Sequence, residues 1–287
     1  MIAMFRRFTL VILSLLIAGA VHAQDFGFGL FKPVSSFTAS CSQSTNFIAR
    51  TSGLSNATKT IYDTLICGLV TDGVFSLLDG LYILAAPDST TAGLNLIQNA
   101  FNLTAVGSPT FSANNGYTSA GNLSYLDTGY TPSTSGGNML TNSATLFVYT
   151  QTADTTFNTL VGSFSNAVTN AIIFYSNSTT LVCRLNRVSG ADVTATVSTQ
   201  TGLVVCSRTG ATAVALDQNG TNLVNGTPTS SGLPAQPIGI LGSETSGDQS
   251  NARISAAGFG ASLNSTQQTA VSNRVNATMT SLGINKY

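Results

Sequence analysis

The sequence predicts a mainly β protein, a sandwich of antiparallel strands with helices before it and one helix after it. Two observations predict the strands: apolar side chains alternate with polar ones over short runs, and glycine and asparagine separate these runs. A third observation predicts the helices, because apolar residues recur at helical spacing near both ends of the chain. Many short strands of this kind are typical of a sandwich and not of a parallel α/β sheet.

Residues 1–23 are typical of a secretory signal peptide. Two arginines precede an apolar stretch from Phe8 to Ala20, and the small-residue site Val21-His22-Ala23 follows. The stretch is shorter than the roughly 20 residues that a membrane-spanning helix needs. We therefore expect cleavage after Ala23 and an exported protein in the periplasm, on the cell surface or outside the cell, with no membrane span after cleavage.

An irregular N-terminal arm is expected over residues 24–52, where phenylalanines follow neither a helical nor a strand period. Residues 53–99 are expected to form a helical preface. Apolar positions predict a helix near residues 56–70, a short turn around 75–78 and a buried strand over 81–85. A second helix is expected to begin at Asp88 or Ser89 and to run through Ile97.

Residues 100–287 are expected to form the sandwich and its terminal helix. The alternation places Leu181, Cys183 and Leu185 on one face of a strand, opposite the residues between them. Further strands are expected over residues 144–150, 170–176, 193–197, 203–207, 211–217, 237–242 and 252–260.

Two short motifs mark turns and ends. Asn219-Gly220 predicts a tight hairpin turn, because both residue types tolerate a positive φ. Asn264 and Gln267 have the spacing of a capping box and precede a stripe of apolar residues, so a closing helix is expected over residues 265–282.

Four cysteines remain after cleavage, and an even number in an exported chain indicates two disulfides. Three pairings exist. The local one, Cys41 with Cys67 and Cys183 with Cys206, is favoured because each pair lies in one sequence neighbourhood, and each bridge would contribute ~3 kcal/mol. The spacings are not those of a C-x-x-C metal or redox motif, so no metal site is predicted.

Composition excludes several classes of function. Removal of residues 1–23 leaves nine basic residues against eleven acidic ones, a net charge of about −2, and only 8% of the chain is charged. Such a surface offers no electrostatic footprint for nucleic acid. The only histidine, His22, lies in the signal peptide, which excludes Ser-His-Asp and Cys-His chemistry and histidine-ligated metals from the cleaved protein.

Enzymatic hydrolysis of a glycan would need two carboxylates held about 5–9.5 Å apart. Asp72 with Asp79 and Glu244 with Asp248 are the candidate pairs, and helix capping or loop solvation accounts for both without catalysis. No catalytic residue is therefore predicted.

A candidate ligand site lies in the segment "SYLDTGYTPS". Tyr125, Asp127 and Tyr130 would supply two aromatic faces and a carboxylate beside a glycine-rich stretch that ends at Asn138. Sugars stack their C–H faces on aromatic rings and form hydrogen bonds with such polar groups. Because this chain has no tryptophan, tyrosine and phenylalanine would have to supply the rings. The competing interpretation is that both tyrosines pack the sandwich and that Asp127 bonds its own turn.

No cofactor is predicted, and calcium is the one alternative. A calcium site needs six to eight oxygen ligands, and Asp217-Gln218-Asn219-Gly220 has part of that character. The hairpin interpretation accounts for the same four residues without a metal.

Several longer segments carry a family resemblance: "GLVTDGVFSLLDGLYILAAPDST", "NLTAVGSPTF", "GYTSAGNLSYLDTGYTPS" and the late "ARISAAGFGASLNSTQQTAV". Over residues 46–285 the chain resembles laminin G-like or concanavalin A-like modules of bacterial, prophage and phage-associated proteins. The resemblance implies a concanavalin A-like jelly-roll sandwich, a fold used for glycan binding, adhesion, receptor recognition and, less often, glycan cleavage. Glycosidases of this fold carry an E-x-D-x-E motif, but Glu244 is the only glutamate here, so no catalytic residue transfers.

The sequence thus favours a secreted, non-enzymatic, lectin-like module whose partner is a glycan or cell-surface polysaccharide and whose role is carbohydrate binding or adhesion. The alternative is a structural or receptor-recognition component of an extracellular or phage-related assembly. A glycan-active hydrolase or lyase ranks third. The signal peptide favours the first, because virion proteins assemble in the cytoplasm; oligomerisation stays open.

Overall fold

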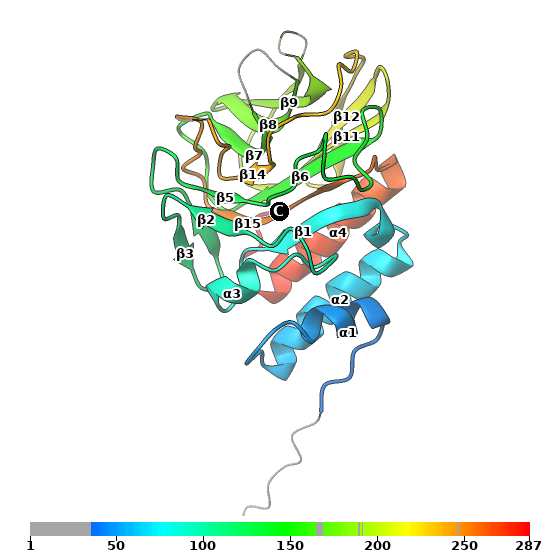
Figure 1. The fold of residues 1–287 in the computed structure, drawn as a ribbon, viewed down its shortest axis with the longest axis vertical. Helices are drawn as coiled ribbons and strands as arrows, with labels where there is room; N and C mark the ends of the chain where they lie inside the picture. Colours follow the sequence, from blue (N-terminus) through cyan, green and yellow to red (C-terminus); the bar gives the residue numbers. More distant parts are fainter. Residues whose placement is uncertain (1–35, 165–168, 189, 191, 246) are drawn as a thin grey trace, which may run out of the picture. The chain divides into compact units, whose positions relative to one another are not determined.

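In the computed structural model, two antiparallel sheets pack face to face and helices cover the outer surface of one of them (Figure 1). The structure describes residues 36–164, 169–188, 190, 192–245 and 247–287. The predicted signal peptide and residues 24–35 of the predicted arm lie outside the described residues. The mainly β sandwich with few helices that the sequence predicts is confirmed.

The first sheet, sheet A, is the one that the helices cover. Its strands run in the order β13-β12-β11-β6-β15-β4-β3, and β1 also pairs with β15. The strands of sheet A are β1 Leu78–Ile83, β3 Thr110–Ser112, β4 Gly116–Thr118, β6 Ala144–Thr150, β11 Gly202–Gly210, β12 Ala213–Gln218, β13 Thr221–Gly226 and β15 Ile254–Gly260.

The second sheet, sheet B, has its outer face turned away from the helices. Its order is β10-β9-β8-β7-β14-β5-β2. The strands of sheet B are β2 Thr104–Val106, β5 Tyr125–Asp127, β7 Thr159–Ser163, β8 Asn170–Asn177, β9 Thr180–Arg187, β10 Val193–Thr196 and β14 Gly239–Ile240.

Strand alternation builds the core between the sheets. Leu181, Cys183 and Leu185 of β9 all point into it, as predicted, and Ile173 and Tyr175 of β8 join them. Successive side chains of a strand point to opposite faces. The residues between these apolar ones therefore lie on the outer face of sheet B.

The hairpin between β12 and β13 turns at Asn219-Gly220, as predicted. Both residues have positive φ, 52° and 74°, and Gln218 pairs with Thr221 across the turn. Two oxygens that a calcium ion would need are engaged by the protein. Asp217 Oδ1 accepts from Asn222 at 2.6 Å, and Asn219 Oδ1 accepts from the Leu203 amide at 2.8 Å.

A second core lies between sheet A and the helices α1 Ser42–Ile48, α2 Asn56–Thr71 and α4 Ser265–Ser281. Both long helices start at capping residues, and the cap of α4 is the predicted one. Ser55 accepts from the Thr58 amide at the start of α2, and Asn264 and Gln267 form the capping box of α4. Among the described residues, no helix is long and apolar enough to cross a membrane.

Three predictions about the first hundred residues are corrected. Helix α1 replaces part of the irregular arm. The preface is part of the sandwich, because β1 pairs with β15 of sheet A and its six residues are all buried. A short 3₁₀ turn at Phe75–Leu77 precedes β1. Helix α3 begins after its cap, Asp88, and covers only Ser89–Ala92. The chain leaves the helix at Gly93, and Asn95 then bonds the backbone of Leu81 and Ala100.

The four cysteines form the favoured local pairs. Cys41, the N-cap of α1, joins Cys67 of α2, with a Cα–Cα distance of 5.7 Å. Cys183 of β9 joins Cys206 of β11, at 6.3 Å, so this bridge connects sheet B to sheet A. The two sulfur pairs differ in access to solvent, since Cys183 and Cys206 are at most 1% exposed while Cys41 and Cys67 are half-buried.

This difference predicts the order in which the bridges are reduced. Their sequence separations, 26 and 23 residues, are nearly equal, so the entropic contribution of each is about 3 kcal/mol and does not distinguish them. Because exchange requires access of the attacking thiolate, a mild reductant on the native protein should open Cys41–Cys67 first. Alkylation followed by mass spectrometry measures this, and equal or earlier loss of Cys183–Cys206 would contradict it.

Candidate functional site

The tyrosines of the predicted ligand site are part of the interior. Tyr130 is fully buried and packs on Phe101 and Phe259, with ring centroids 5.1 and 4.8 Å away. Tyr125, in β5, is only 6% exposed. Neither ring has a free face on which a sugar could stack.

The polar members of the predicted site have structural partners. Asp127 Oδ1 accepts from the Gly129 amide at 2.8 Å and so holds its own turn. The Asn138 side chain donates to the carbonyl oxygens of Ser76 and Leu78 at 3.2 and 3.4 Å. We therefore correct the expected site: Tyr125, Asp127, Tyr130 and Asn138 pack the sandwich and hold its turns.

Asp79 of β1 is the centre of these contacts. Its carboxylate accepts from the backbone amides of Asn138 and Met139 at 2.7 and 2.9 Å, and from the Tyr130 hydroxyl at 3.2 Å. That hydroxyl also lies 2.7 Å from the carbonyl oxygen of Gly136. Burial raises the pKa of Asp79, and the three hydrogen bonds oppose the rise. The buried carboxylate thus fastens residues 136–139 to β1.

Replacement of Tyr130 by Phe tests the structural role of the hydroxyl. It removes one of the three hydrogen bonds to the buried Asp79 carboxylate and the side-chain partner of the Gly136 carbonyl, so the free energy of unfolding should fall by about 1–3 kcal/mol. Ligand binding should be unchanged, because the ring itself remains in the core. Urea titration and a binding measurement test the two halves. Weaker binding at unchanged stability would return Tyr130 to the ligand site.

Three of the four carboxylates that the sequence offered for catalysis have structural partners. Asp72 is bonded by both Nε and Nη2 of Arg274 at 2.8 and 3.1 Å, and this hydrogen bonding lowers its pKa. Asp79 is held as described above. Glu244 is exposed, whereas Asp248 is half-buried and accepts from Ser243 and Thr159.

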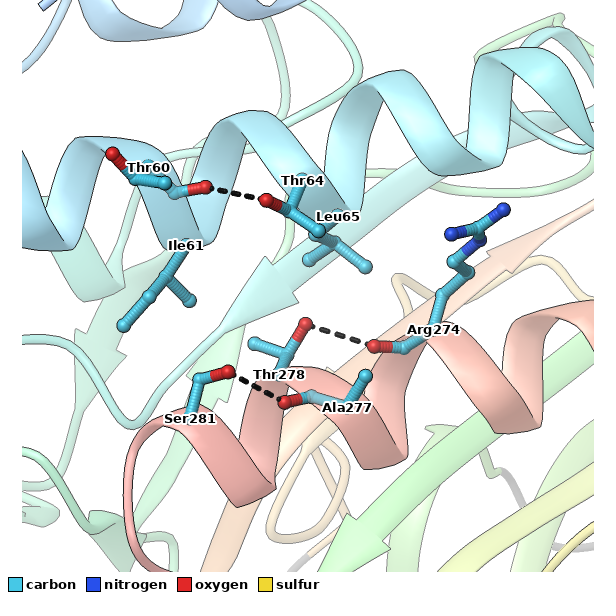
Figure 2. Close-up of a pocket in the computed structure, with 8 residues that line it drawn as sticks. All are labelled: Thr60, Ile61, Thr64, Leu65, Arg274, Ala277, Thr278 and Ser281. Atoms are coloured by element: carbon cyan, nitrogen blue, oxygen red, sulfur yellow. Dashed lines mark hydrogen bonds between the residues drawn. The ribbon is translucent and has the colours of Figure 1, made fainter.

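A groove between α2 and α4 is one hollow on the described surface, with a volume of about 130 Å³ (Figure 2). Its hydroxyls are turned back onto their own helices: Thr64 donates to the Thr60 carbonyl, and Thr278 to the Arg274 carbonyl, each at 2.9 Å. The groove therefore offers small apolar groups and few polar ones, which does not suit a polar ligand.

A larger hollow of about 370 Å³ lies on the outer face of sheet B, and we call it the sheet B cavity. Other hollows have similar volumes, so the chemistry of the lining distinguishes this one. It combines three phenylalanine rings with a cation, a carboxylate, an amide and hydroxyls. The lining residues are Phe157, Asn158, Thr159, Phe164, Ile172, Phe174, Arg184, Thr245, Gly247 and Asp248.

The strand register brings these side chains together. Thr159 of β7 pairs with Phe174 of β8, while Ile172 of β8 pairs with Arg184 of β9. Ile172 and Phe174 alternate with Ile173 and Tyr175, which point into the core. Two neighbouring cross-strand rows therefore form the floor of the cavity on the outer face of the sheet.

A loop before β7 supplies Phe157. The buried carboxylate of Asp154 shapes this loop by accepting from the Thr156 amide at 3.0 Å and from the Asn158 amide at 3.1 Å. Phe157 has a φ of 58°, a left-handed conformation that is unfavourable for a bulky residue, and its side chain is 38% exposed. The loop thus presents an aromatic ring to solvent at the cavity, at a cost in backbone energy.

The charged groups of the cavity are held by defined partners. Arg184 forms a bidentate ion pair with Asp192, with Nε–Oδ1 at 2.8 Å and Nη2–Oδ2 at 2.7 Å. Asp248 accepts from the Ser243 hydroxyl at 2.7 Å and from the Thr159 hydroxyl at 3.0 Å. Burial raises the pKa of Asp248, while these hydrogen bonds act in the opposite direction.

Sequence reasoning missed this cavity. Strand β7 was not predicted, and the lining comes from four separate stretches of the chain. Part of it followed from the sequence: a strand was expected over residues 170–176, which include Phe174, and the alternation predicted for β9 places Arg184 opposite its core-facing residues.

No protein-family model matches the sequence, and no curated protein matches it. Among solved structures, the fold is similar to the binding domain of Paraclostridial Mosquitocidal Protein 1, with a TM-score of 0.50 and 14% identity. That match covers 68% of this chain and 52% of the other, so this chain spans about half the length of that structure. The similarity supports the sandwich fold alone.

Two further matches have lower TM-scores. Domain 4 of AbnA, a GH43 extracellular arabinanase from Geobacillus stearothermophilus solved with arabinotriose, gives 0.45 at 16% identity and covers 68% of this chain and 98% of that one. The CBM40 of Ruminococcus gnavus IT-sialidase gives 0.38 at 12% identity, with coverages of 46% and 83%. The concanavalin A-like subclass stays a prediction.

Proposed function

We propose that this chain is an exported glycan-binding module that holds a sugar in the sheet B cavity. The observation that carries the proposal is the combination of exposed and half-buried phenylalanine rings with hydrogen-bonding groups in one hollow. Sugar rings have apolar C–H faces and polar edges, so they fit sites where a ring lies beside polar groups. Phe157 and Phe174 would supply the faces, and Asn158, Thr245 and Asp248 the polar contacts.

Two further features support the proposal. The paired cysteines are typical of proteins that fold in an oxidising compartment, which agrees with export. Solved domains with some similarity of fold are in complex with arabinotriose or bound to α2,6 sialyllactose. Adhesion would follow where the bound glycan is displayed on a cell surface.

A binding role without catalysis is the form of the proposal that the cavity supports best. Among the described lining residues, Asp248 is the only carboxylate. Asp192 is held in the ion pair with Arg184 and is not one of the lining residues. Glycoside hydrolysis by the usual route needs two carboxylates that both reach the sugar, so the lining supports recognition and not bond cleavage.

Substitution of the two rings tests the proposal. On a glycan array, Phe157→Ala and Phe174→Ala should each weaken binding about tenfold or more, equivalent to a loss of about 1.4 kcal/mol. Leu140→Ala is the matched control, because Leu140 is 56% exposed and is not a lining residue of the cavity. Its binding should equal that of the unmodified chain.

The array also separates the competing functions. A blank array with filaments or oligomers in solution would favour the structural component that the sequence left as its alternative. Release of reducing sugar would show catalysis. Hits that survive both phenylalanine substitutions would place the glycan elsewhere on the molecule.

A further inference from the structure

The charged groups at the sheet B cavity do not leave an excess of positive charge. Arg184 is its one lining cation among the described residues, and Asp192 and Asp248 are the neighbouring carboxylates. With Asp248 ionised the three groups carry a net charge of −1, and with Asp248 protonated they are neutral. In neither state does the cavity attract an anion.

Arg184 is committed to Asp192. Its fork binds both carboxylate oxygens, and only 11% of the Arg184 side chain and 16% of the Asp192 side chain are exposed. A bidentate pair that is largely shielded from water is strong and directional. A carboxylated ligand would have to displace Asp192 or bind a guanidinium whose charge is already neutralised.

The hydroxyls of the cavity present acceptors. Thr159 donates its proton to Asp248 at 3.0 Å, and Thr245 donates its proton to the Phe164 carbonyl at 2.9 Å. Both hydroxyl oxygens therefore offer a ligand only lone pairs. The Asp248 carboxylate adds further acceptor sites, because an ionised carboxylate has about four lone-pair sites in all. Sugar hydroxyls can donate to such groups, whereas an ionised ligand carboxylate can only accept.

Resting on the proposed glycan-binding function, we infer that the sheet B cavity selects a neutral, hydroxyl-rich sugar and rejects carboxylated sugars such as uronic or sialic acids. The Arg184–Asp192 pair and the acceptor-rich lining are the two independent reasons. Asp192 acts as a positioning residue, because it withholds the Arg184 fork from the ligand.

The test uses matched glycans and the full chain. Each glycan that the protein binds on the array is compared with a partner that differs only in whether a carboxylate is free or esterified, such as polygalacturonate with its methyl ester or sialyllactose with its methyl ester. The neutral member should bind at least about tenfold more tightly. Phe174→Ala, run in parallel, shows whether binding takes place in this cavity.

Asp192→Asn supplies a second readout. It removes the counter-charge of Arg184, so the ratio of affinities should shift toward the carboxylated member. The ratio is measured within one protein sample, and therefore it does not depend on how much of the variant is folded.

The outcomes separate this inference from the function on which it rests. Tighter binding of the carboxylated member, lost in Phe174→Ala, would overturn the charge selectivity and leave glycan binding intact. An unchanged ratio in Asp192→Asn would overturn the role of the ion pair. Absence of any glycan hit, or hits that Phe174→Ala does not weaken, would overturn the proposed function itself.

Discussion

Sheet A has two apolar faces, and the rest of the structure depends on covering both. All seven residues of β6 and all seven of β15 are buried. Leu146 and Val148 point into the core between the sheets, while Phe147 and Tyr149 point into the core beneath the helices. A sheet buried on both faces reads as a continuous apolar run, and it needs a layer on each side.

The two faces of sheet A are covered by different layers. Helices α1, α2 and α4 cover one face of sheet A, and Arg274 of α4 is tied to Asp72 at the end of α2. Sheet B covers the other face, and its own outer side lies opposite the helices, at the top of the view in Figure 1. The helices do not cover the outer face of sheet B, and this is the face on which the sheet B cavity lies.

Buried polar groups in the sandwich set the positions of its loops. Asp79 fastens residues 136–139, and Asp154 shapes the turn that presents Phe157. Arg208, fully buried, donates to the carbonyl oxygens of Leu185, Gly210, Ala211 and Pro228, and burial lowers its pKa to about 10. Such groups are costly to bury without partners, which is why their hydrogen bonds determine loop geometry.

Features that depend on residues close together in the sequence could be predicted, whereas features that depend on distant residues could not. The capping box at Asn264 and the hairpin turn at Asn219-Gly220 depend on contacts between near neighbours, and the facing of β9 follows from a period of two, so these features were predicted. Burial of Tyr125 and Tyr130 depends on strands far away in the chain. The apolar surroundings of Tyr130 include Phe259, which no local pattern relates to it.

The sheet B cavity was not predicted either, because it also depends on segments that are far apart in the chain. Phe157 reaches it through a left-handed backbone position that Asp154 stabilises, and strand alternation says nothing of such a loop. Arg184 was placed correctly on the outer face, but no pattern in the sequence identified Asp192 as its partner. The pattern of neighbouring residues predicts individual helices and strands. The lining of the sheet B cavity depends instead on how the strands are aligned with one another.

Hydrogen exchange with and without a glycan found on the array tests most directly whether the open face of sheet B is the functional face. The expected result is slower amide exchange in β7, β8 and β9 and in the loop that carries Phe157, with no change in α2 and α4. Protection confined to the groove between α2 and α4, or to residues 125–138, would contradict the assignment of binding to this face.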